Sequence, residues 1–178
     1  MAGRDDKVIG VDLGATTTKL AVVSASGQLK SDIKVITTVE DPEKFMENLK
    51  TTIKELLDNN VRAIGLGIPS WDGERQVIGH SPNMPKYEGL AVGKLLEEEF
   101  KELKIIVDND ANVAADGERQ FGGWEDGTIV VYTLGTGIGG GVILFIKEQK
   151  RCIKWQGDKF RGAELGHVSI PVPYGRGS

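Results

Sequence analysis

A strand, a glycine turn and a second strand occur twice in this sequence, once at Asp12 and once at Gly135. In the first unit an apolar run ends at Asp12, Gly14 follows, and a second apolar run covers Leu20 to Val23. The second unit has a strand from Thr128 to Leu134 and then a glycine-rich turn over residues 135–141. Glycines placed directly after apolar runs mark tight turns or close approach of the backbone to a ligand. The chain is therefore expected to present two hairpin turns built for close contact.

The residues after the first unit predict a sheet covered by a helix. Ile33 to Val39 reads as a third strand, and Asp41 precedes Pro42 as the N-cap of a helix. Apolar residues from Phe45 to Leu57 recur at helical spacing, and Val61 to Ile68 is an apolar run that suits a buried strand. A hairpin followed by a strand–helix–strand unit implies a mixed sheet with a parallel core.

The pattern then continues through the middle of the chain. Residues 69–89 are rich in Pro and Gly and are expected to form a long loop, and loops of that length are usually functional or mobile. A helix from Leu90 to Lys101, a strand from Ile105 to Val107 and a short helix from Ala111 to Gln120 follow. After the turn at residues 135–141, Val142 to Ile146 is the next predicted strand.

The restart of the strand pattern after Gly122-Gly123 indicates two lobes in an α/β protein. The predicted division is an N-terminal lobe over residues 1–109 and a second lobe over residues 110–178. No long flexible linker separates them, so a hinge is expected near residues 108–124. A glycine hairpin without covering helices exposes apolar edges, so these residues are expected to belong to a longer chain or to pair with another copy.

Composition excludes several classes of partner. The net charge is −4 and the pI is about 5.3, which gives no electrostatic reason for binding nucleic acid or an anionic membrane. No apolar run approaches the roughly 18 residues that a membrane helix needs. The polar first residues do not resemble a signal peptide, and the single cysteine, Cys152, cannot form an internal disulfide. A reducing cytoplasm is the expected location.

The first turn has the chemistry of a phosphate site. Backbone N–H groups beside Gly14 and the hydroxyls of Thr16 and Thr17 are groups that hold phosphate oxygens. Asp12 is a candidate to hold hydrated Mg²⁺, which prefers oxygen ligands and keeps several waters, and Lys19 adds positive charge. The alternative is an ordinary polar hairpin, with Lys19 as a surface residue.

The second turn is a further phosphate candidate through Gly135, Thr136 and Gly137. Its spacing, G-x-G-x-G-G-G, is followed by a strand and is not the dinucleotide-binding fingerprint. A plain glycine-rich turn is the alternative. Two such hairpins in one chain favour a phosphate held between two lobes.

Asn109 and Asp110 stand where a strand meets a helix. Both residue types are standard N-caps, which is the structural interpretation. A carboxylate at the carboxyl end of a strand is also where α/β folds place catalysis. Phosphoryl transfer to an alcohol requires a carboxylate that accepts the hydroxyl proton. The functional interpretation makes Asp110 that base and Asn109 a hydrogen-bond partner of the acceptor.

Glu164 and His167 place a carboxylate and an imidazole three residues apart near the end of the chain. A single pair at this spacing is more often structural than catalytic. His80, in the loop of residues 69–89, is expected to be a solvated histidine.

Four motifs occur in the order seen in the ROK family, and the chain resembles that family from about residue 8 to residue 176. The motifs are Asp12-Leu-Gly-Ala-Thr-x-x-Lys19, Asn109-Asp-Ala-Asn-Val-Ala-Ala-x-Gly-Glu118, Thr133-Leu-Gly-Thr-Gly-Ile-Gly-Gly-Gly-Val142 and Gly162-Ala-Glu-Leu-Gly-His167. The combination is specific, while any one motif is not. Ile68-Pro69 and Ser81 to Pro85 also look like the sugar-side loops of the family, which includes bacterial glucokinases.

The resemblance implies a ribonuclease-H-like, actin-like ATPase fold, here the N-terminal lobe plus the start of the second lobe. It also implies roles for particular residues. Asp110 would be the general base, and Asn109, Glu164 and His167 would bind the sugar. Asp12 and the two hairpins would handle the phosphates of Mg-ATP.

The chain departs from the family pattern after His167. In the family a cysteine-rich segment follows, and three cysteines with the histidine bind a structural zinc. No cysteine follows His167 here, so a zinc site needs cysteines from elsewhere. Ser70 stands where many members have glycine. Residues 147–161, which include Trp155, are longer and more polar than the usual hairpin and match no family element.

The expected function is ATP-dependent phosphorylation of a hexose or N-acetylhexosamine, with Mg²⁺ as cofactor. The identity of the sugar, the hydroxyl that is phosphorylated and polyphosphate as an alternative donor stay open. The alternative function is a truncated relative that binds sugar or nucleotide without catalysis and acts through assembly. A repressor is disfavoured, because family repressors carry a DNA-binding segment ahead of the first turn and only 11 residues precede Asp12.

Overall fold

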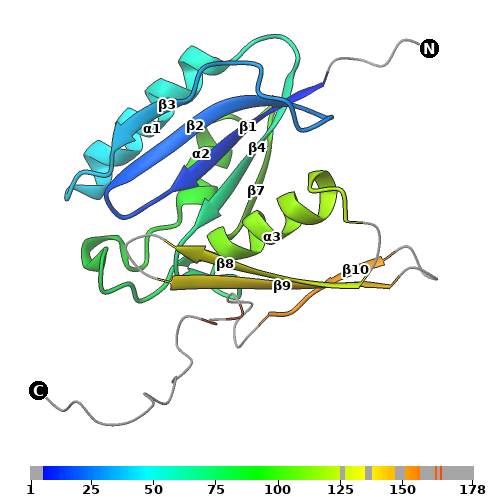
Figure 1. Ribbon diagram of the computed structural model, residues 1–178. Coiled ribbons are helices and arrows are strands. Elements are labelled where there is room, and N and C mark those ends of the chain that lie inside the picture. Colours follow the sequence, from blue (N-terminus) through cyan, green and yellow to red (C-terminus); the bar gives the residue numbers. More distant parts are fainter. Residues whose placement is uncertain are drawn as a thin grey trace, which may run out of the picture.

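The two larger sheets in the described part of the chain lie on either side of one helix (Figure 1). The computed structural model describes residues 6–124, 127–134, 138–146, 151–156, 163 and 165. The first sheet has five strands in the order β3-β2-β1-β4-β7, and the second has three in the order β10-β9-β8.

The first sheet is mixed, as the sequence predicted. Its strands are β1 (Lys7–Leu13), β2 (Thr17–Ser24), β3 (Lys34–Thr37), β4 (Val61–Ile68) and β7 (Lys104–Asn109). β2 pairs antiparallel with β1 and β3, while β4 pairs parallel with β1 and β7. The helical crossovers that join β3 to β4 and β4 to β7 are α1 (Pro42–Leu56) and α2 (Val92–Glu99).

The start of α1 is encoded locally. The Asp41 carboxylate accepts hydrogen bonds from the backbone N–H groups of Glu43 and Lys44, and Pro42 begins the helix, so the predicted cap is confirmed. At the outer surface Lys50 and Lys54 of α1 pair with Glu99 of α2. The hydrogen bond from Lys54 and its charge lower the pKa of Glu99.

The main core lies between the first sheet and the helices α1 and α2. Strand side chains alternate between faces, so Ile64, Leu66 and Ile68 of β4 enter this core together. Phe45 of α1 is fully buried there, and its ring meets the edge of the Tyr87 ring at 5.4 Å between centroids. The opposite face of β4 is left for another element.

Residues 69–89 are more ordered than the expected long loop. They contain a two-stranded sheet of β5 (Trp71–Asp72) and β6 (Val77–Ile78) and a short 3₁₀ helix, η1 (Pro85–Tyr87). Their apolar side chains join the main core, which is why the segment is packed; these are Trp71, Ile78, Met84 and Tyr87. The predicted long loop thus contains short regular elements, which the sequence did not indicate because burial of these residues depends on partners far away in the sequence.

The second sheet is an antiparallel meander of β8 (Gly127–Leu134), β9 (Ile138–Ile146) and β10 (Arg151–Lys154). The predicted turn over residues 135–141 was too long, because Ile138 to Gly141 pair with β8 as part of β9. β10 lies in the segment 147–161 that matched no family element. The sequence did not predict this strand.

Helix α3 (Asp110–Phe121) lies between the two sheets (Figure 1). Glycines on both sides let it approach closely. A Cβ on Gly67 of β4 would lie 3.3 Å from the Cα of Asp110. A Cβ on Gly141 of β9 would collide with the carbonyl oxygen of Ala111 and lie 2.9 Å from the Cβ of Ala115. These glycines therefore serve packing against α3. α3 contacts both sheets, so it does not by itself mark a boundary between two lobes. The division of the chain between residues 109 and 110 stays a prediction.

One face of β8 is apolar and exposed. Val130, Tyr132 and Leu134 alternate along the strand, and Leu134 is 81% exposed. This matches the expected exposure of apolar residues, while pairing with another copy stays a prediction.

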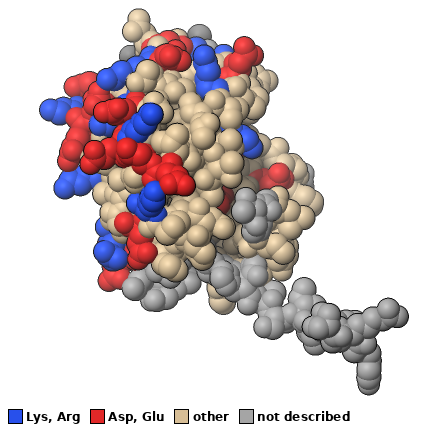
Figure 2. Space-filling view, turned by 90° about the vertical axis from the view of Figure 1, so that its left-hand side faces the viewer, with Lys and Arg blue, Asp and Glu red and all other residues tan. Residues whose placement is uncertain are grey.

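In the described part of the chain no helix is both long and apolar enough to cross a membrane. On the face shown in Figure 2, acidic and basic side chains are intermingled and no large area has one sign.

Candidate active site

A cavity of about 940 Å³ opens between the first hairpin, the segment after β4, the start of α3 and the end of β8. The sequence-predicted residues of the described chain meet at this cavity. They are Asp12, Gly14, Thr16, Thr17, Lys19, Asn109 and Asp110. Residues separated by almost a hundred positions thus line one space, because the parallel strands β1, β4 and β7 end at the same edge of the sheet.

The first hairpin turns where glycine is required. A Cβ on Gly14 would lie 2.7 Å from the carbonyl oxygen of Thr17, which is closer than real Cβ contacts allow. The Gly14 N–H donates to that same oxygen at 3.1 Å. The turn is therefore closed by a backbone hydrogen bond that a larger residue would displace.

Thr38, after β3, holds this turn from behind. Its hydroxyl donates to the Gly14 carbonyl at 2.7 Å and lies 3.0 Å from the buried Thr18 hydroxyl, and its N–H donates to the Thr16 carbonyl at 3.0 Å. Thr16 and Thr17, in contrast, are exposed and line the cavity. Two of the three consecutive threonines are thus available to a ligand. The sequence contained no signal for Thr38, because its partners lie some twenty residues earlier.

Asp12 and Lys19 face each other across the β1–β2 ladder. They are register partners, and Lys19 Nζ lies 3.9 Å from Asp12 Oδ2 with both side chains more than half exposed. An exposed pair at this distance contributes little to stability. Both groups are free to rearrange, so the carboxylate suits a hydrated divalent cation and the ammonium suits a phosphate. Among the described residues no group of three or more acidic, His or Cys side chains forms a closed metal site.

Asn109 and Asp110 begin α3 at the floor of the cavity. The Asn109 Oδ1 accepts from the backbone N–H groups of Ala111 at 3.0 Å and Asn112 at 3.2 Å, so the N-cap interpretation is confirmed. Asn109 is 6% exposed. Asp110 is the first helical residue, its Oδ1 accepts from the Ala111 N–H at 2.7 Å, and its side chain belongs to the cavity wall. The positive end of the helix favours a carboxylate at this position.

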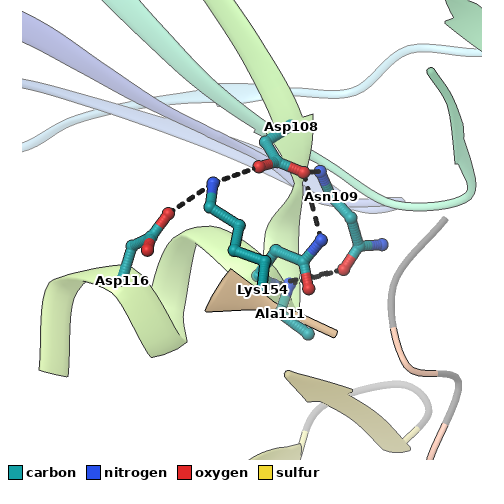
Figure 3. A network of polar contacts seen from close by, with 6 residues as sticks. Asp108, Asn109, Ala111, Asp116 and Lys154 are labelled. Carbon is teal, nitrogen blue, oxygen red and sulfur yellow. Dashed lines mark hydrogen bonds and ion pairs between the residues drawn. The ribbon is translucent and has the colours of Figure 1, made fainter. Parts of the chain in front are cut away.

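A polar network lies beside this helix start (Figure 3). Lys154 of β10 places its Nζ 2.5 Å from Asp108 Oδ2 and 2.5 Å from Asp116 Oδ2. Burial lowers the pKa of Lys154, but the hydrogen bonds and charges of the two carboxylates outweigh it, so the pKa is raised overall. Sequence reasoning missed this network, because Lys154 is 46 residues away from Asp108 in a segment without a motif.

The segment after β4 supplies polar side chains on the other side of the cavity, namely Ser70, Ser81 and Asn83. Ser70 has a φ of 54°, a left-handed conformation that favours glycine. His80 is exposed and pairs with Glu88 at 3.1 Å, as expected for a solvated histidine.

Several predicted residues lie outside the described part of the chain. They are Gly135, Thr136, Gly137, Glu164 and His167. The described residues that border the second turn do reach the cavity, since Leu134, Ile138, Gly139 and Gly140 line it. A Cβ on Gly140 would lie 2.5 Å from the Cβ of Leu165, so the Leu165 side chain packs on β9 at this glycine.

Known proteins are similar to this chain in sequence and in fold. The glucokinase of Thermotoga maritima is 36% identical over 168 residues, which are 92% of this chain and 51% of that protein. A putative xylose repressor of Caldicellulosiruptor is 29% identical, over 92% of this chain and 41% of its own length. The crystal structure of a ROK family glucokinase from Streptomyces griseus with glucose and AMPPNP superposes with a TM-score of 0.78 at 28% identity, covering 92% of this chain and 51% of that one.

The chain spans about half the length of the relatives that it matches. The likeness to the S. griseus structure confirms the ribonuclease-H-like, actin-like ATPase fold that the motifs implied. The ROK family model matches residues 8–176, which is nearly the whole chain. This chain therefore belongs to the ROK family.

Proposed function

We propose that a protein containing this chain transfers a phosphoryl group from ATP to a hydroxyl of a hexose. The observation that carries the proposal is the shared cavity, in which a hairpin suited to phosphate faces a helix that begins with Asp110. A phosphate site alone would fit many nucleotide-binding proteins. A carboxylate in the same space adds the group that alcohol phosphorylation requires.

On the phosphate side, the N–H groups near Gly14 and the hydroxyls of Thr16 and Thr17 would hold phosphate oxygens. Lys19 would neutralise part of their charge. Asp12 would hold Mg²⁺ through water, and the exposed carboxylate at the mouth of the cavity fits that role. The bound cation would supply charge neutralisation at the transferred phosphoryl group. Gly135, Thr136 and Gly137 are proposed to hold phosphates from the second sheet.

On the sugar side, Asp110 would accept the proton of the attacking hydroxyl as general base. Asn109, Glu164 and His167 would bind further hydroxyls. The Asn109 Oδ1 is occupied by two backbone N–H groups, so its amide nitrogen is the group left to donate to a sugar oxygen. A zinc site at His167 is not proposed for this chain without additional cysteines.

The relatives are consistent with this assignment by name, since they include glucokinases of several bacteria. Relatives named as repressors also occur. The net charge of −4 gives this chain no electrostatic reason to bind DNA, which disfavours a repressor. A carboxylate beside the proposed phosphate site favours a kinase, because phosphoryl transfer to an alcohol requires a base. We propose that the chain is part of a cytoplasmic sugar kinase and acts within a longer chain or as a homodimer.

The test is a coupled ADP-release assay against a panel of hexoses and N-acetylhexosamines, with ATP and Mg²⁺. It is run on this chain and on a longer form that includes it. Asp110→Asn is expected to lower kcat by about 10²–10⁴, the usual contribution of a general base. Asp32→Asn, at an exposed carboxylate outside the cavity, is the matched control and should leave the rate unchanged.

A folded Asp110→Asn variant with an undiminished rate would remove Asp110 from the role of base. Sugar or nucleotide binding without turnover in either form would instead indicate the non-catalytic relative. Circular dichroism of each variant checks that loss of rate is not loss of fold.

A further inference from the structure

Lys154 joins three elements that are remote in sequence. It stands at the end of β10, a strand that pairs only with β9 among the described strands. From there its ammonium reaches the end of β7 through Asp108 and the middle of α3 through Asp116, at 2.5 Å in each case. The second sheet is thus tied to both segments that flank Asn109-Asp110.

Asp108 passes this connection to the helix start. One of its oxygens, Oδ2, is held by Lys154. The other, Oδ1, accepts from the Asn109 N–H at 2.7 Å and from Asn112 Nδ2 at 3.1 Å. Asn109 in turn caps α3. Lys154 is therefore connected through Asp108 to Asn109, the residue whose side chain holds the first turn of the helix.

The charges make the lysine necessary to this arrangement. Asp108 and Asp116 each have an oxygen within 2.5 Å of the same nitrogen, so without the cation two carboxylates would face each other at short range. The Asp108 side chain is only 15% exposed, which leaves little water to screen the repulsion. Like charges in such surroundings separate or take up a proton. Separation would displace Asp108 from the Asn109 N–H or move α3, and protonation of Asp108 would make its Oδ1 a weaker acceptor for that N–H.

We propose that Lys154 is a positioning residue for the proposed phosphoryl transfer, because it holds the Asp108 carboxylate that orients Asn109 and the start of α3. The inference rests on the proposed function for the role of Asp110. Lys154 is not among the residues that line the cavity. Its effect passes through Asp108 and the backbone.

The first arm of the test does not depend on activity. Hydrogen exchange of the Asn109, Ala111 and Asn112 amides is measured in the wild type, in Lys154→Met and in Lys154→Arg. Lys154→Met keeps much of the side-chain length without the charge and should speed exchange of these amides at least tenfold. Lys154→Arg should stay near the wild type, since arginine keeps the charge and can hold two carboxylates.

The matched control is Lys86→Met. It removes the exposed ion pair between Lys86 and Glu40, which are 2.6 Å apart and take no part in the network of Lys154. Exchange of the Asn109, Ala111 and Asn112 amides should not change in this variant. A change there would mean that any lost ion pair loosens α3.

The second arm is kinetic and uses the form of the protein that shows kinase activity. In Lys154→Met, kcat per folded molecule should fall about ten- to hundredfold, because small misplacements of a catalytic group cost rates of this size. The KM for ATP should stay unchanged, since the first hairpin is outside the network. Lys154→Arg should recover most of the rate.

The outcomes separate the two proposals. Unchanged amide exchange in Lys154→Met overturns the positioning role, whatever the activity. A lower melting temperature with unchanged kcat per folded molecule also overturns it, because that is a structural role alone. If exchange accelerates while Asp110→Asn keeps full activity, the connection from Lys154 to Asn109 stands and the assignment of Asp110 fails.

Discussion

The two sheets of this molecule are built on the same hairpin pattern but are buried to very different extents. β1 and β2 of the first sheet contribute fully buried side chains, including Ile9, Leu13 and Leu20. β8 of the second sheet has no fully buried residue, and in β9 the large buried side chain is Ile143. The first sheet has its own hydrophobic core, which lies between the sheet and the helices α1 and α2. The second depends on α3 for the covering of one face.

This difference indicates how stability and function are divided. The main core forms from residues before Asn109 and holds the first hairpin rigidly. The second sheet approaches the cavity through β8 and β9, whose strands have fewer fully buried side chains than those of the first sheet. We therefore expect substitutions in the first sheet to cost more free energy of unfolding than matched substitutions in the second.

The largest expected effect is a pair of phenylalanine truncations. Phe45→Ala removes a fully buried ring from α1 and should lower the free energy of unfolding by about 3–5 kcal/mol. Phe145→Ala, in β9, removes a half-buried ring that lies 3.8 Å below the Arg119 guanidinium, and should cost about 1–2 kcal/mol. Urea unfolding measures both, and equal costs would contradict the contrast between the sheets.

The second prediction concerns alkaline pH. Burial, with the nearby Asp41 charge, raises the pKa of Tyr87 to about 12, while the unfolded chain titrates near 10. Because the folded state holds this proton more tightly, the stabilisation is present below pH 10 and is lost as pH rises through 12. Two pKa units correspond to about 2.7 kcal/mol.

Tyr87→Phe isolates this contribution. It removes the hydroxyl that donates to the Val39 carbonyl and so costs about 1 kcal/mol at neutral pH. Between pH 10 and 12 it should lose less stability than the wild type. The raised pKa of Lys154 contributes in the same direction in both proteins, so the difference between them reports Tyr87. Parallel curves for the two proteins would be the contrary result.

The third prediction compares two glycines in strands. Gly141→Ala puts a methyl group against the Ala111 carbonyl and Ala115, so it should displace α3 and cost about 1–3 kcal/mol. Gly65→Ala in β4 meets no atom within 4 Å and should change stability by less than about 1 kcal/mol. Melting temperatures measure the pair, and a well-tolerated Gly141→Ala would mean that α3 is not tightly seated on β9.

The smallest expected effects come from the two helix caps. Asp41→Ala removes an exposed cap from α1 and should cost about 1 kcal/mol, while Asn109→Ala removes a buried cap from α3 and should cost about 2 kcal/mol. The larger cost reflects the buried N–H group of Asn112, which would lose its acceptor, while the Ala111 N–H keeps Asp110 Oδ1. Denaturant unfolding distinguishes the two, and a reversed order would indicate that α3 is held mainly by its contacts with the sheets.

Much of the fold and part of the site could be predicted from local patterns. The Asp41-Pro42 start of α1, the strand from Val61 to Ile68 and the turn at Gly14 depend on residues within a few positions of one another. The side chains at the carboxyl ends of β1 and β7 could be assigned to one cavity, because parallel strands end together.

Other features follow from contacts between remote segments and have no local signal. Ile138 to Gly141 looked like a turn because of their glycines, yet they form a strand whose glycines accommodate α3. The segment of residues 69–89 looked like a loop, yet its apolar residues fill the main core. Thr38 supports the first hairpin through Gly14, 24 residues earlier, and Lys154 holds Asp108 beside the start of α3, 46 residues earlier. Such contacts exist only once the chain has folded, since burial and ion pairing are set by which distant groups the fold brings together.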